Sequence, residues 1–214
     1  MKVRLTALCI GLAILFAAMP ALAGPALEFG AKAGLTFATQ DYEYTGLPLE
    51  ADRGYATGLT LAFFSEASFA TGLSARPEIM YVQKGNKLTF HETTEQYPEG
   101  TGRTIDVVER IDYLAIQPLL KAGLPLGTAS VYALAGPRMD ILVRTSSDMP
   151  STIVENHEPV LFGATFGGGV QFPLSPALKL CLEYYYFHDF QDAYDGTEVK
   201  VHNKASAVMV GLKF

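Results

Sequence analysis

Apolar and polar residues alternate with a period of two along most of this chain, which is the pattern of β-strands whose two faces differ. The clearest stretch is the last ten residues. Its apolar face consists of Val208, Val210, Leu212 and Phe214. Its other face holds Met209, Lys213 and several small residues. The pattern predicts a strand with one continuous apolar side, as in the closing strand of a soluble sandwich or a strand that faces lipid.

Seven further stretches of this kind precede the last one, so the pattern predicts eight strands. They lie at about 27–37, 55–63, 72–81, 113–122, 131–141, 162–172 and 178–186. Short Gly, Pro or Ser turns are expected at 65–68, 123–127 and 173–176, and long polar loops at about 39–53, 86–109, 145–158 and 188–203. Alternating short and long connections are typical of hairpins in series.

Charges are segregated on one face of these strands. Every apolar face lacks a charged residue, and the opposite faces carry Glu28, Lys32, Arg76, Glu78, Lys121, Arg138, Asp140, Lys179, Glu183 and Lys213. A soluble sandwich seldom keeps so long an apolar face in eight strands, whereas lipid outside and a polar lumen inside require it. The sequence therefore predicts an all-β, eight-stranded antiparallel up-and-down transmembrane β-barrel. Its termini and short turns are expected in the periplasm, and its long loops outside.

The amino terminus has the features of a secretory signal peptide. Lys2 and Arg4 precede an apolar run, and an Ala-x-Ala site ends at Ala23. Residues 1–23 are expected to be removed, and residues 24–214 to form one barrel domain. Cys9 lies within the apolar run and follows a leucine, which argues against lipid anchoring.

Removal of the signal changes the charge and the cysteine count. The 16 basic residues fall to 14 against 22 acidic ones, a net charge of −8, which argues against a nucleic-acid partner. Cys181 is the only remaining thiol, so a disulfide framework is excluded. It is expected to be inert packing inside the lumen. No other stretch is long and apolar enough for a membrane-spanning helix.

Four short motifs lie on the predicted strands: Arg76-Pro-Glu-Ile-Met-Tyr-Val-Gln-Lys-Gly85, Tyr113-Leu-Ala-Ile-Gln-Pro-Leu-Leu-Lys121, Tyr132-Ala-Leu-Ala-Gly-Pro-Arg138 and Gly211-Leu-Lys-Phe214. On these motifs the chain resembles the eight-stranded outer-membrane β-barrel proteins often labelled porin-family or PorT-type. Ala115 departs from the pattern, because many relatives are expected to carry a carboxylate there. The resemblance covers nearly all of the mature chain.

That resemblance implies an outer-membrane location and insertion by the barrel-assembly machinery through the C-terminal strand. Gly211, Leu212 and Phe214 are the expected assembly signal. The implied partners are outer-membrane lipid and lipopolysaccharide. The resemblance names no partner for the extracellular loops, and no cofactor is expected. Individual functions within the family are mostly unknown.

The four histidines suggest an alternative, an outer-membrane enzyme that modifies lipid A. His91, His157, His188 and His202 all fall in or beside expected outer loops. A deacylase pairs a histidine with a nearby serine and a carboxylate, but no His-x-Ser occurs here. Solvated loop histidines are therefore the preferred interpretation, and no catalytic residue is assigned.

Two further groups of residues are candidate sites. Asp189, Asp192 and Asp195 recur every three residues and can gather oxygens around Ca²⁺, but they lack the spacing of a calcium loop and its closing Glu. A solvated acidic loop over residues 189–198 is preferred, with no metal site. Tyr184, Tyr185 and Tyr186 are expected to form an aromatic girdle at the membrane interface.

The interior is predicted to be plugged by an ionic network. Its members are Arg76, Glu78, Lys121, Arg138, Asp140, Lys179 and Glu183. The resulting hypothesis is a non-enzymatic outer-membrane barrel with a plugged lumen and acidic outer loops that contact partners or lipopolysaccharide. The alternatives are the lipid A enzyme and a soluble ligand-binding barrel of lipocalin type.

Three prolines fall within neighbouring strands, although proline cannot donate to a ladder. They are Pro77, Pro118 and Pro137. We expect bulges or missing ladder bonds at these positions.

Overall fold

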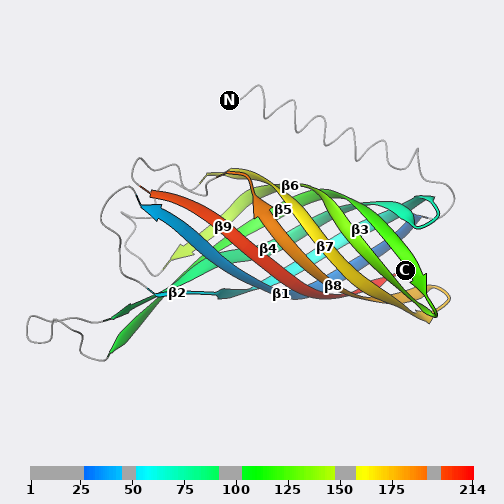
Figure 1. Cartoon of the computed structure of the whole chain (residues 1–214), viewed down its shortest axis with the longest axis horizontal. Coiled ribbons are helices and arrows are strands. Elements are labelled where there is room, and N and C mark those ends of the chain that lie inside the picture. Colours follow the sequence, from blue (N-terminus) through cyan, green and yellow to red (C-terminus); the bar gives the residue numbers. More distant parts are fainter. Residues whose placement is uncertain (1–26, 45–51, 92–102, 148–157, 192–198) are drawn as a thin grey trace, which may run out of the picture.

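The computed structural model describes residues 27–44, 52–91, 103–147, 158–191 and 199–214 (Figure 1). These residues form nine strands: β1 (Leu27–Tyr44), β2 (Asp52–Gly54), β3 (Ala56–Ala70), β4 (Leu73–His91), β5 (Thr104–Leu126), β6 (Ala129–Ser147), β7 (Val160–Ser175), β8 (Leu178–Asp189) and β9 (Val199–Lys213). Within the described ranges, none of the chain forms a helix capable of crossing a membrane.

Eight of the strands close into an antiparallel barrel, which confirms the predicted fold class. The order is β1, β3, β4, β5, β6, β7, β8, β9 and back to β1. The seam joins the first and last strands, and Phe29 and Phe214 exchange backbone hydrogen bonds of 2.9 and 2.8 Å. Closure leaves no free sheet edge along the seam. The short β2 pairs with β4 near Lys87.

The two ends of the barrel differ. One end, called the turn end below, holds Leu27, Phe214 and the tight turns at 71–72, 127–128 and 176–177; it lies at the right of Figure 1. Gly72 and Gly127 have φ values of 74° and 63°, a region that favours glycine. The other end is called the loop end.

The predicted strand bounds were too short. Residues 65–68 are not a turn, because β3 continues through Glu66 to Ala70 and pairs with β4. At the loop end, half of the expected loop at 86–109 is strand, since β4 reaches His91 and β5 begins at Thr104. Polar residues in these stretches suggested turns, but ladder bonds to neighbouring strands extend the sheet beyond the apolar pattern. The other predicted connections are shortened in the same way.

The predicted faces are correct in all eight barrel strands. Apolar side chains on the outward face are exposed, for example Leu35, Phe63, Leu120 and Val208 at 50%, 71%, 64% and 51%. The inward face is buried and holds both apolar and charged side chains, such as Met80, Tyr113 and Arg76, each at 0% exposure. The polar lumen therefore lies where a soluble protein would have its apolar core.

The prolines interrupt the ladder as expected. The pairing of β3 with β4 has a gap opposite Pro77, and that of β5 with β6 has a gap spanning Pro118 and Pro137. On their other sides Pro77 pairs with Pro118, and Pro137 pairs with Ala164. Each proline thus removes a donor on one side of its strand only.

Candidate functional site

The inward face brings charged side chains together in three clusters along the barrel axis. The central cluster consists of Lys32 from β1, Arg76 and Glu78 from β4, and Glu183 from β8. Lys32 Nζ lies 2.7 Å from a carboxylate oxygen of Glu78 and 2.7 Å from one of Glu183. Arg76 Nη1 donates to Glu183 at 2.6 Å. All four side chains are at most 1% exposed.

Neutral side chains complete the central cluster. Tyr132 and Tyr185 donate hydroxyl hydrogen bonds to Glu183 at 2.5 and 2.9 Å. Gln117 donates to Glu78 at 2.8 Å. The Arg76 guanidinium lies 3.6 Å from the ring centroid of Phe64, a cation–π geometry. Two cations and two carboxylates therefore balance in a buried section, where unpaired charge is most costly.

A second cluster lies nearer the loop end. It consists of Lys84, Arg138, Asp140 and Asp189. Lys84 Nζ donates to Asp140 at 2.7 Å and to Asp189 at 3.0 Å. Arg138 pairs with Asp189 and places its Nε 3.0 Å from Asp140. This cluster is also balanced, with two charges of each sign.

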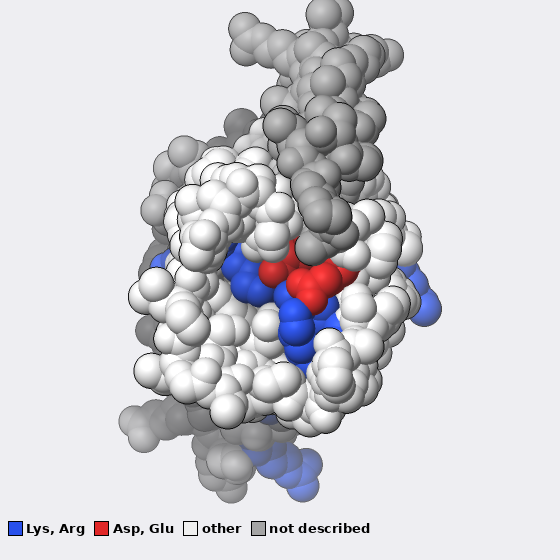
Figure 2. All heavy atoms as spheres, turned by 90° about the vertical axis from the view of Figure 1, so that its right-hand side faces the viewer, with Lys and Arg blue, Asp and Glu red and all other residues white. Residues whose placement is uncertain are grey.

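The third cluster occupies the mouth at the turn end. Its members are Glu28, Glu66, Lys121, Lys179 and Lys213. Lys121 Nζ donates to both carboxylate oxygens of Glu66 at 2.8 and 3.0 Å. Lys213 bridges Glu66 and Glu28 at 3.1 and 2.7 Å, and Lys179 pairs with Glu28. Figure 2 looks into this mouth and shows the charged side chains inside a rim without charge.

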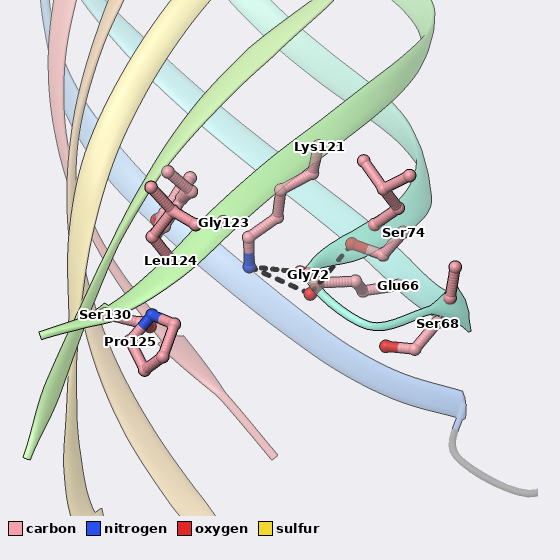
Figure 3. Close-up of a pocket in the computed structure, with 12 residues that line it drawn as sticks. Glu66, Ser68, Gly72, Ser74, Lys121, Gly123, Leu124, Pro125 and Ser130 are labelled. Atoms are coloured by element: carbon pink, nitrogen blue, oxygen red, sulfur yellow. Dashed lines mark hydrogen bonds and ion pairs between the residues drawn. The ribbon is translucent and has the colours of Figure 1, made fainter.

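A cavity of about 220 Å³ opens between the turns at this mouth. Figure 3 shows Lys121 reaching from β5 toward Glu66 across the cavity, with Ser74 also hydrogen-bonded to Glu66. Leu124 and Pro125 form part of its apolar wall. Three of the polar side chains that line it, Glu66, Ser74 and Lys121, are therefore engaged with one another.

The structure places all seven network residues of the sequence interpretation on the inward face. Arg76, Glu78 and Glu183 meet in the central cluster, Arg138 and Asp140 in the second, and Lys121 and Lys179 at the mouth. Six further partners are absent from the predicted network: Glu28, Lys32, Glu66, Lys84, Asp189 and Lys213. The alternation predicts that Glu28, Lys32 and Lys213 face inward, but it places Glu66 in a turn and Asp189 in a loop. For Asp189, the sequence does contain a signal: the alternation of inward positions continues through Tyr185 and Phe187 to this residue.

Several candidate residues differ from expectation. Asp189 does not belong to a solvated loop, because it is 7% exposed and ion-paired in the lumen; Asp192 and Asp195 lie outside the described residues. Tyr185 is buried in the central cluster, whereas Tyr184 and Tyr186 are exposed on the outer face as a girdle requires. The correction follows from strand alternation, because consecutive residues point to opposite faces.

The histidines and the cysteine show no reactive arrangement in the described part. His188 lies exposed on the outer face, its ring 5.7 Å from that of Phe190. The side chains of His91, His157 and His202 lie outside the described residues. Cys181 is free and buried, as expected for packing. No group of metal-ligating side chains occurs among the described residues.

A closed eight-stranded barrel with an apolar outer face and ion pairs inside defines an integral β-barrel protein of a membrane. The chain belongs to the outer membrane protein β-barrel domain family, which it matches over residues 9–214. It is therefore a protein of the outer membrane, as the sequence predicted.

One solved structure supports the fold. OprG from Pseudomonas aeruginosa is similar with 14% identity and a TM-score of 0.53, covering 90% of this chain and 98% of that chain. The Neisserial surface protein NspA has 12% identity and a TM-score of 0.47, covering 86% and 95%. No curated protein is similar enough to count as a match.

Proposed function

We propose that this protein is a non-enzymatic structural or surface-interaction protein of the outer membrane whose lumen is plugged. The observation that carries the proposal is the central cluster, whose ion-paired side chains come from strands on different sides of the barrel. Eight strands leave an interior just wide enough for side chains, whereas porins use 16 to 18 strands. Side chains in that section therefore occupy the space that a channel would need.

Electrostatics support the same proposal. A permeating ion would have to separate Lys32 and Arg76 from Glu78 and Glu183, since these side chains contact one another across the section. Breaking buried pairs leaves uncompensated charge and is strongly unfavourable. A few trapped waters are compatible with such a section, but a continuous water column is not.

The refolded monomer is expected to show little or no steady conductance in a planar lipid bilayer. Glu78→Gln should lower the stability of the barrel before it opens a path, because Lys32 and Gln117 lose their charged acceptor. Current is measured alongside a 16-stranded porin as the conducting control. Reproducible large channels from a verified monomer would contradict the plugged lumen.

The proposed orientation places the turn end in the periplasm and the loop end outside. It follows from the short turns, the first described residue Leu27 and the C-terminal Phe214 lying at one end. Function at the cell surface then falls to the outer connections, whose acidic residues are proposed to contact partners or lipopolysaccharide. Insertion is proposed to use the barrel-assembly machinery, with Gly211, Leu212 and Phe214 as its signal.

Deleting Phe214 is expected to reduce the folded membrane fraction several-fold. Its backbone exchanges two hydrogen bonds with Phe29 at the seam, and its side chain is 65% exposed on the outer face. Loss of both weakens closure and removes the terminal aromatic group. Folded and unfolded protein are separated by the mobility of unboiled samples on gels after insertion by reconstituted assembly machinery. Phe172→Ala, another exposed outer aromatic, is the control, and equal insertion of wild type and deletion would refute the role.

A further inference from the structure

Charges on the outer face are distributed unevenly between the two ends of the barrel. In the described strands, outward side chains near the turn end are uncharged, and Figure 2 shows that rim without charge. Near the loop end, outward positions carry Lys87, Arg110, Arg144 and Lys204. Among the outward side chains that the structure describes there, Asp112 is the acidic one, and Glu158 lies just before β7. The outer face thus has one charged band, and the described side chains in it are mainly basic, although the chain as a whole is acidic.

Three of these cations form a line across neighbouring strands. Arg110 on β5 lies opposite Gly85 on β4 and opposite Ser146 on β6. Lys87 is two residues beyond Gly85, and Arg144 is two residues before Ser146, so each is a diagonal neighbour of Arg110. Diagonal neighbours on one face of an antiparallel sheet are about 7–8 Å apart, within reach of long side chains.

The environment leaves the guanidinium groups accessible. The side chains of Arg110 and Arg144 are exposed. Gly85 presents no side chain beside Arg110, and a Cβ there would lie 2.0 Å from the carbonyl oxygen of Glu109. Asp112, opposite Arg144, is half-buried and accepts a hydrogen bond of 3.1 Å from Gln83. Among the described side chains here, three cations thus lie beside one partly engaged carboxylate.

We propose that Lys87, Arg110 and Arg144 form a binding site for the phosphate groups of a phosphorylated glycolipid in the outer leaflet. The site borders the apolar belt, because the exposed Ile79 and the half-buried Tyr81 precede it along β4. A lipid can thus place its acyl chains against the apolar outer face and its phosphates against the cations. Arginine forms paired hydrogen bonds to phosphate oxygens, and two guanidiniums at this spacing can hold one phosphate between them.

The test is lipid retention by the refolded full-length barrel, measured by native mass spectrometry in detergent. The probes are bis-phosphorylated lipid A, the same lipid A with its phosphates removed, and inorganic phosphate as competitor. The wild type is expected to retain the phosphorylated lipid at concentrations several-fold lower than the dephosphorylated one. Arg110→Gln combined with Arg144→Gln should raise the half-saturating concentration at least about fivefold, as loss of two charge-assisted contacts implies.

Matched variants separate the site from general charge and from misfolding. Lys204→Gln removes an exposed cation from β9, away from the line, and should change retention less than about twofold. Arg110→Lys with Arg144→Lys keeps the charge and should retain part of the binding. Unchanged gel mobility of unboiled samples shows that each variant is folded. Equal retention of both lipids, equal retention by the double glutamine variant, or loss of the lipid to millimolar inorganic phosphate would overturn the proposal.

The inference rests on the proposed orientation of the barrel, which is tested separately. Thr104 is exposed at the loop end and Thr128 is exposed at the turn end. The two labelling variants are Thr104→Cys and Thr128→Cys. A membrane-impermeant maleimide should label the first and not the second in intact cells, while the buried Cys181 stays unlabelled. Reversed labelling would overturn the orientation and with it the outer-leaflet site, whereas the conductance result bears on the plugged lumen alone.

Discussion

Glu183→Gln should lower the free energy of unfolding of the barrel by about 3–5 kcal/mol, the range found when one partner of a buried ion pair is removed. The carboxylate accepts hydrogen bonds from Lys32, Arg76, Tyr132 and Tyr185, so one substitution affects four donors. The two cations would be left sharing Glu78. Because the chain has no tryptophan, urea titrations in lipid vesicles are followed by circular dichroism and by gel mobility.

The matched control is Glu28→Gln, the same substitution at the mouth. The Glu28 side chain is 28% exposed, so water compensates part of its lost pairing with Lys179 and Lys213, and we expect a loss below about 1 kcal/mol. Adding Arg76→Met to Glu183→Gln should recover part of the stability, because a buried cation is removed together with its acceptor. Similar losses for the two glutamine variants would refute the central cluster as the main ionic contribution.

Gly34→Ala should destabilise the barrel by about 1–3 kcal/mol, the usual cost of overpacking. Gly34 lies on β1 at the seam with β9, opposite Met209. A Cβ there would lie 2.0 Å from the carbonyl oxygen of Val208 and 2.7 Å from the Cα of Met209. Both are backbone atoms, which cannot rotate away, so the first and last strands must separate slightly. The measurement is the urea midpoint of the folded form in vesicles.

Gly123→Ala provides the same change near the turn end without crowding. Its Cβ would lie 3.4 Å from the Cβ of Tyr132, an ordinary contact, so we expect a change within about 0.5 kcal/mol. Equal midpoints for the two alanine variants would show that the seam tolerates a side chain at Gly34. A selective loss at Gly34 would identify close approach of β1 and β9 as a condition for closure.

These expectations depend on a lumen in which stability comes from paired charges as well as from packing. Lipid surrounds the apolar outer face, so burial of that face does not distinguish one barrel geometry from another as it would in water. Contacts inside the lumen join strands that are not neighbours, such as β1 with β8 and β4 with β8. Such contacts hold a particular register, because a shift by one residue would turn the charges toward lipid.

Alternation in the sequence determined the strands and their faces. Whether a side chain such as Arg76 or Leu120 points inward or outward depends on its position within its own strand, which is local information. The same alternation identified all seven predicted network residues as inward-facing. It failed where local composition suggested a turn, as at Glu66 within Ser-Glu-Ala-Ser, and where the apolar signal ended before the strand, as at Asp189.

Only the tertiary structure decided which charges meet. Glu183 contacts Lys32 and Arg76, which are 151 and 107 residues away along the chain. These three side chains lie at the same level along the barrel axis because of the tilt of the strands and the stagger that accumulates around the barrel. Each ladder contributes to that stagger, including the bulge between Asp112 and Tyr113. The sequence of a single strand does not determine the total stagger. The ion pairs therefore arise only when the whole barrel closes.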